Sequence, residues 1–156
     1  MQTAKQLSVS LVNKPGRLAA MLAALSKEKV NFRALSVMDS GDRGTVRFVP
    51  DDSVKAGHVL DELNLRYQPA DVLMVEIPGH SGAFRRICER LAAEHLNLDY
   101  AYCSFGESGV KAGAVAVIKV NDLIKAQKVL NENGTATRRT MLTPRKKLPV
   151  RRAVRA

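Results

Sequence analysis

The chain has 156 residues, of which 46% are hydrophobic, and carries a formal net charge of +10 at pH 7. This length suits one ordinary domain or two small ones, and the hydrophobic content is sufficient for a buried core. The longest apolar runs are of strand length, far short of the roughly 20 residues that cross a bilayer, which excludes a transmembrane helix. The N-terminal stretch is typical of a first strand rather than a signal peptide, so we expect a soluble, cytoplasmic protein.

The positive charge is concentrated at the C-terminal end. Residues 1–138 hold 18 of the 25 lysines and arginines and all 15 acidic residues, so this part carries only +3. Residues 143–156 contain two prolines and no acid, which predicts a basic, disordered tail. Such a tail is either a solvated extension or a loose attachment to nucleic acid, membrane or an acidic partner.

The sequence repeats itself internally. A shift of 66 residues aligns the alternating segment Leu7–Leu11 with Leu73–Ile77, and the helix-like segment Leu18–Leu25 with Phe84–Leu91. The two copies therefore share a strand, a turn and a helix, and we interpret the chain as a duplication.

The second part of each copy aligns at a shift of 70 residues. The helical segment after Asp52 matches the segment after Asp122. In the strand before it, Val46 falls on Ala116 or, slipped by one residue, on Val115, so two registers for this strand are possible.

Hydrophobic periodicity assigns the elements of each copy. Leu7, Val9 and Leu11 alternate with polar residues, as in a strand with one buried face, whereas Leu18 to Leu25 follow helical spacing. Two alternating runs around residues 40–42 predict a hairpin. A second helix then begins near residue 51, and a short strand follows near residues 65–67, or 135–142 in copy two.

This β-α-β-β-α-β order, with both helices on one face of an antiparallel sheet, is the ferredoxin-like motif. The predicted fold class is α+β, with two tandem domains at residues 1–70 and 71–142 before the tail. A single copy of this size seldom gains more than about 3 to 5 kcal/mol from its core, and its sheet edges stay unpaired. We therefore expect the copies to pack side by side as an intrachain pseudo-dimer, and a homodimer of chains is possible.

The turn between the first strand and the first helix carries the clearest chemical signal. Gly16 allows close approach of a ligand, and the N–H groups of the first helical turn favour a carboxylate. Asn13 adds an amide that can both donate and accept, which suits the ammonium and carboxylate of an amino acid. Asn31 opens the next strand. A plain turn and a solvated strand start explain the same residues without any ligand.

The turn NKPGRL, the helix LAAMLAALSKEKV and the closing VNF resemble an ACT domain, a small regulatory βαββαβ module attached to many enzymes of amino-acid metabolism. The resemblance covers both copies. It implies that an amino acid binds at the interface between paired domains, held by this loop and by the asparagine that opens the second strand. The residues so implied are Asn13, Lys14, Pro15, Gly16, Arg17, Leu18 and Asn31.

The second copy departs from this pattern in the first three residues of the loop but keeps the glycine and the asparagine. Its site is therefore expected to be altered or silent. Its weaker candidates are Gly79, His80, Ser81, Gly82 and Asn97. In some serine-sensing relatives the position of Leu11 is polar, so an aliphatic or aromatic amino acid fits this chain better.

Other chemistry finds little support in the sequence. Cys88 and Cys103 lack metal-binding or redox spacing and are predicted to be buried, reduced core thiols. His58, His80 and His95 are too scattered for a metal site. No catalytic motif is present, so we expect neither an enzyme nor a cofactor.

Tyr100 and Tyr102 share one side of their strand, on the sheet face away from the helices. On the other side lie Ala101 and Cys103, whose counterparts in the first copy, Leu35 and Val37, are expected to face the core. The two tyrosines mark either a contact with another subunit or an ordinary half-wet sheet. A sheet that binds RNA needs aromatic residues on its central strands. The central positions hold Ser8, Ser10, Thr45 and Arg47 instead, so nucleic acid is not expected to bind except through the tail.

The sequence therefore predicts a non-catalytic regulatory protein that binds a small ligand, most simply an amino acid, and acts on an enzyme through the association of its domains. The alternative is a structural or interaction protein with a degenerate ligand site, whose basic tail recruits an acidic partner or nucleic acid.

Overall fold

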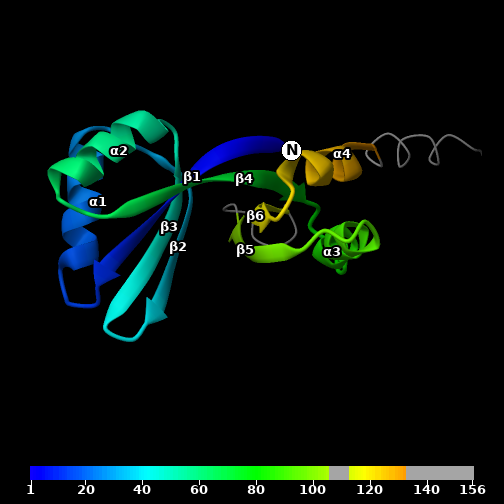
Figure 1. Ribbon diagram of the computed structural model, residues 1–156, viewed down its shortest axis with the longest axis horizontal. Helices are drawn as coiled ribbons and strands as arrows, with labels where there is room; N and C mark the ends of the chain where they lie inside the picture. Colours follow the sequence, from blue (N-terminus) through cyan, green and yellow to red (C-terminus); the bar gives the residue numbers. More distant parts are fainter. Residues whose placement is uncertain (106–112, 133–156) are drawn as a thin grey trace, which may run out of the picture.

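In the computed structural model, residues 1–105 and 113–132 are described, and they form one six-stranded antiparallel sheet with four helices (Figure 1). The strand order is β2-β3-β1-β4-β6-β5. In chain order the elements are β1 (Gln2–Val12), α1 (Arg17–Lys27), β2 (Phe32–Ser40), β3 (Arg43–Pro50), α2 (Ser53–Glu62), β4 (Tyr67–Ile77), α3 (Ala83–Ala93), β5 (Leu98–Phe105), β6 (Ala114–Val120) and α4 (Leu123–Glu132). The predicted α+β, ferredoxin-like fold is confirmed.

Two long strands, β1 and β4, form the centre of the sheet. They pair antiparallel along Gln2–Val9 and Tyr67–Met74. The second half of β1 also pairs with β3, and the second half of β4 pairs with β6. The two halves of the sheet therefore have the same strand arrangement on either side of its centre. In this symmetry β1 corresponds to β4, β2 to β5, and β3 to β6.

The first half of β1 lies beside the second half of the chain, an arrangement that the sequence did not predict. From the internal repeat, a strand near residues 135–142 is expected to pair with β4. Those residues lie outside the described part of the chain. In the structure Gln2–Gln6 pair with β4 at this place. Lys5 and Asp71, which are 66 residues apart, face each other there and form an ion pair of 2.8 Å. The predicted boundary at residues 70 and 71 thus falls inside one continuous strand.

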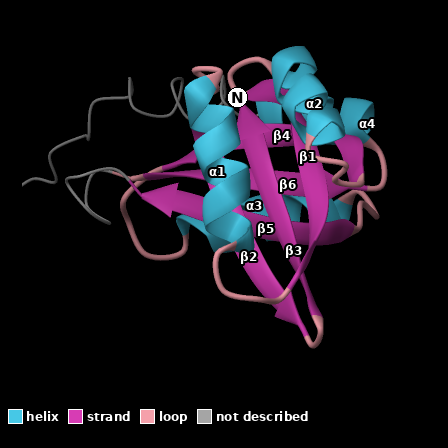
Figure 2. Cartoon of the chain, turned by 90° about the vertical axis from the view of Figure 1, so that its left-hand side faces the viewer, coloured by secondary structure: helices cyan, strands magenta, loops and turns pink. Residues whose placement is uncertain are grey.

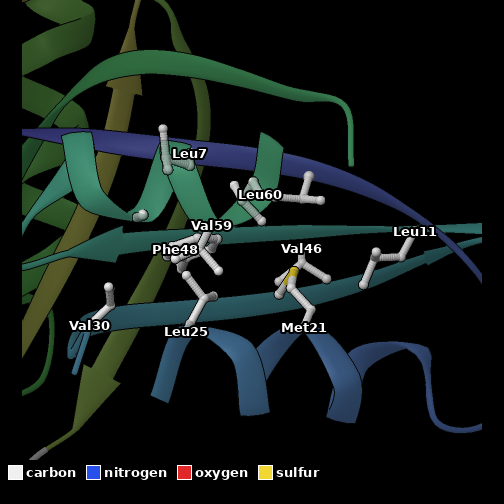
Figure 3. Packing of buried hydrophobic residues seen from close by; sticks show 11 residues of the cluster. Leu7, Leu11, Met21, Leu25, Val30, Val46, Phe48, Val59 and Leu60 are labelled. Atoms are coloured by element: carbon white, nitrogen blue, oxygen red, sulfur yellow. The ribbon is translucent and has the colours of Figure 1, made fainter. Parts of the chain in front are cut away.

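Two hydrophobic cores lie under the helices. The first packs α1 and α2 against β1 and β3, around Met21, Leu25, Phe48 and Leu60 (Figure 3). Figure 2 shows α1 in front of these strands. The second packs α3 and α4 against β4 and β6, and it contains both Ala116 and Ile118. Because Val46 and Phe48 are the corresponding residues of the first core, the unslipped register is the one observed.

The sheet is curled, so that its two edge strands, β2 and β5, approach each other. On the concave face, away from the helices, a third apolar cluster forms from Ala34, Val49, Val72, Met74 and Val117.

Both tyrosines of β5 lie on this concave face and are engaged within the chain. Gln6 is fully buried, and its amide donates to the Tyr100 hydroxyl at 2.6 Å and accepts from the Tyr102 hydroxyl at 3.0 Å. Desolvation raises the pKa of the Tyr102 hydroxyl above its usual range.

Three expectations about burial are wrong. Leu35 and Val37 of β2 were expected to face the core, but they are 41% and 53% exposed because the first two helices pack on β1 and β3. Cys103, on the other edge strand, is exposed, and Cys88 on α3 is only partly buried. Both are free thiols, and partial desolvation raises the pKa of Cys103.

No helix of the described residues is long and apolar enough to cross a membrane.

Candidate ligand-binding loops

The loop between β1 and α1 ends in a glycine that leaves the helix N-terminus open. Gly16 has a φ of 83°, in the left-handed region that favours glycine, and no side chain caps α1. Within the loop, the Arg17 N–H donates to the Lys14 carbonyl at 3.3 Å. Because no side-chain acceptor covers the first turn, an incoming carboxylate can accept hydrogen bonds there.

The helices α2 and α4 begin differently. The Asp52 carboxylate accepts from the N–H groups of Val54 and Lys55 at 3.1 and 3.0 Å. The Asp122 carboxylate accepts from the N–H of Lys125 at 2.9 Å. These helix N-termini already carry their own carboxylate, whereas α1 and α3 do not.

Asn13 fastens the loop to the β2–β3 hairpin. Its backbone N–H donates to the carbonyl of Asp42 at 2.9 Å. Its side-chain amide donates to the Asp39 carboxylate at 3.2 Å and to the carbonyl of Gly41 at 3.3 Å. The amide that was predicted to meet a ligand is thus engaged in positioning the loop.

The other predicted residues of the first loop are accessible apart from one. Lys14, Pro15 and Arg17 are exposed, so the two cations stand in solvent next to the open end of α1. Leu18 is partly buried and packs against the first core. The loop therefore presents backbone N–H groups and positive charge to the solvent. The packing of Leu18 against the first core holds it in place.

Asn31 lies at the far end of α1 from Asn13. Its side-chain amide donates to the Asp51 carboxylate at 2.8 Å and its backbone N–H donates to the same group at 3.1 Å. These bonds hold the pKa of the Asp51 carboxyl below its usual range. An 11-residue helix is about 16 Å long, so one chain does not bring Asn13 and Asn31 together.

The loop before α3 repeats the backbone of the first loop. Gly82 has a φ of 79°, no side chain caps α3, and the Ala83 N–H donates to the His80 carbonyl at 3.3 Å. The side chains differ, since the His80 ring accepts from the Arg86 guanidinium at 3.1 Å.

A cavity of about 290 Å³ adjoins the second loop and is lined in part by His80 and Gly82. Ser81 is exposed, and Gly79 precedes it in the same loop. Asn97 is tied to its own neighbourhood, because its backbone N–H donates to the Asn121 side chain at 3.0 Å and its amide donates to Asp99 at 2.9 Å.

Two aspartates of the first site were missed by sequence reasoning. Asp39 and Asp51 are the partners of the two predicted asparagines. Their only sequence signal was their position. Asp39 lies near the end of β2, before the hairpin turn, and Asp51 directly follows β3. Acids are common at such turns, so the position alone did not reveal a role.

The ACT domain family matches residues 5–64. Among solved structures, the chain is similar to protein BT0572 from Bacteroides thetaiotaomicron, with 32% sequence identity and a TM-score of 0.77 over 85% of this chain and 89% of that one.

The chain is also similar to the regulatory subunits of aspartate kinase from Thermus thermophilus, in its ligand-free form, and from Thermus flavus. The identities are 12% and 14%, and the TM-scores are 0.59 and 0.60. The alignments cover 83% and 88% of this chain and 91% and 97% of those chains. At such identities the likeness shows the fold. A search of curated proteins found no match.

Proposed function

We propose a regulatory role from one premise: the chain belongs to the ACT-domain family, and residues 5–64 form the matched domain. ACT domains bind small ligands and are themselves non-catalytic, and no catalytic family is indicated for this chain. The proposed ligand is an amino acid, and the proposed target is an enzyme whose activity changes with the association of these domains in the cytoplasm.

One observation carries the proposal. The helix after the NKPGRL loop begins at a left-handed glycine without a capping side chain, next to Lys14 and Arg17. Uncovered N–H groups, the helix dipole and two cations favour the carboxylate of an amino acid. Leu11 lies just before the loop and is buried in the first core, so this position offers no polar group to the hydroxyl of a ligand. The proposed amino acid is therefore aliphatic or aromatic.

A second copy of the chain would complete the site. Asn13 contacts Asp39 near the end of β2, whereas Asn31 directly precedes its start. If two chains pair antiparallel along β2, Asn31 of one chain comes next to the Asn13 loop of the other. The edge strand β2 suits such a contact because three of its apolar side chains are exposed, namely Leu35, Val37 and Met38.

The second half of the chain is proposed to be a second ACT-like unit. The symmetric strand order and the repeated loop backbone support this tandem arrangement. Its altered loop makes it a structural partner of the first unit or a site of different specificity.

The hydrogen bonds of Asn13 and Asn31 favour a competing function, that of an interaction protein. Because both side-chain amides are engaged by aspartates, the loop is also consistent with an interaction protein that has lost its ligand.

A thermal-shift panel of the twenty amino acids decides between these functions. A ligand at 100 times its dissociation constant stabilises the folded chain by about 2.7 kcal/mol. We expect an aliphatic or aromatic amino acid to raise the melting temperature of the wild type, and to have little effect on Gly16→Val or Asn13→Ala. A panel in which no amino acid distinguishes the wild type from these variants would reject the sensing role.

A further inference from the structure

The concave face of the curled sheet contains a groove of about 1130 Å³. It opens where β4 begins. Residues of β1, β3, β4, β5 and β6 line it, together with Asp61 of α2 and with Leu65 and Arg66 of the loop that follows α2. No residue of the Asn13–Leu18 loop, nor Asn31, takes part in it. The groove is therefore separate from the Asn13–Leu18 loop, and its volume is sufficient for a small metabolite.

The charged side chains of this groove are mostly cationic. Arg47, Arg66 and Lys119 line it, together with one acid, Asp61. The described part of the chain has three ion pairs, and none includes these cations; they are Lys5–Asp71, Arg85–Glu89 and Lys125–Glu94. A concave surface with uncompensated positive charge concentrates anions.

Arg47 is held in place before any ligand arrives. Its guanidinium lies over the Tyr100 ring, 4.4 Å from the ring centroid, and it also donates to the sulfur of Met38 at 3.0 Å. Tyr100 is fixed in turn by the fully buried Gln6, whose amide donates to its hydroxyl at 2.6 Å. Such a guanidinium loses little freedom when an oxyanion binds to its remaining N–H groups.

The symmetry-related end of the concave face has a different character. A cavity of about 410 Å³ lies there. The charged side chains that line it are Arg33 and Glu76, one of each sign, and the apolar ones are Met1, Met74 and Val115. Because the two ends have the same strand architecture, the excess of cations is a property of one groove and not of the fold.

We propose that the larger groove binds a small metabolite that carries a phosphate group. The Arg47 fork matches the geometry of phosphate oxygens, Lys119 supplies a point charge, and the hydroxyls of Ser8 and Thr45 line the same space. The site gives the protein a second input, independent of the amino-acid loop.

The test uses inorganic pyrophosphate and the full chain. The sequence has three tyrosines and no tryptophan, and two of the tyrosines, Tyr67 and Tyr100, line the groove, so tyrosine emission reports on it directly. At constant ionic strength, we expect saturable binding to the wild type. Arg47→Met and Lys119→Met should each weaken it by about tenfold or more.

Arg33→Met is the matched control, since it removes one cation from the opposite cavity, and its affinity should stay within about twofold of the wild type. Arg47→Lys should fall between wild type and Arg47→Met because it keeps the charge but loses the fork. Gly16→Val should bind pyrophosphate normally, which separates this site from the amino-acid loop.

Three results would overturn the proposal. These are no saturable binding to the wild type, equal losses in Arg33→Met and Arg47→Met, and citrate binding as tightly as pyrophosphate, which would assign the groove to carboxylates.

Discussion

The loops before α1 and α3 share a backbone but not their side chains. Both end in a left-handed glycine, with φ of 83° and 79°, and both leave the helix without a capping side chain. In the first loop an asparagine reaches the β2–β3 hairpin, whereas in the second a histidine contacts the helix that follows. The comparison shows that the glycine determines the backbone conformation of the turn. The side chains determine which neighbouring element the turn contacts.

The largest expected effect concerns whether the two halves fold independently. Phe48→Ala and Ile118→Ala each empty the centre of one core, and we expect each to lower the free energy of unfolding by about 2 to 5 kcal/mol. Because β1 and β4 serve both halves, each variant should shift one cooperative transition. Urea unfolding followed by circular dichroism checks this, and two transitions of which only one moves would show independent halves.

A smaller effect tests the shared loop backbone. Alanine at Gly16 or Gly82 must adopt a left-handed conformation, which costs about 1–2 kcal/mol. An added Cβ would meet no atom within 4 Å at Gly16, and at Gly82 only the flexible Arg85 side chain at 3.7 Å. We therefore expect nearly equal losses in thermal unfolding of Gly16→Ala and Gly82→Ala. A difference larger than about 1 kcal/mol would mean that the loops are not equivalent.

The smallest effect lies where the halves meet. The Lys5–Asp71 pair is half exposed on both sides, at 55% and 54%, so its coupling should be at most about 1 kcal/mol and should weaken in high salt. A double-mutant cycle of Lys5→Met and Asp71→Asn measures it. A coupling well above this value, insensitive to salt, would give the pair a central role in joining the halves.

The sequence predicted those features that depend on local patterns. The alternation of Leu7 to Leu11, the helical spacing from Leu18 to Leu25 and the glycine of the loop led to the correct strand, turn and first helix. The short strand expected near residues 65–67 is instead the start of the long strand β4. The local pattern also failed in an informative way for Cys103 and Val37, because alternation identifies the side of a strand but not whether a helix covers it.

Long-range pairing could not be predicted in the same way. Gln2–Gln6 are mostly polar and show no strand alternation, yet they pair with β4, and Gln6 is fully buried between two tyrosines. The curl that brings β5 toward β2 depends on the whole sheet. The aspartates that hold Asn13 and Asn31 likewise come from other strands or their ends, so only the folded chain identifies them.

The central claim is that the first loop binds an amino acid and the second does not bind the same one. Calorimetric titration of the wild type, Gly16→Val and Gly82→Val with the amino acid identified by thermal shift tests it most directly. We predict one site per chain, lost in Gly16→Val and retained in Gly82→Val. Two equal sites per chain, or full binding by Gly16→Val, would contradict the account.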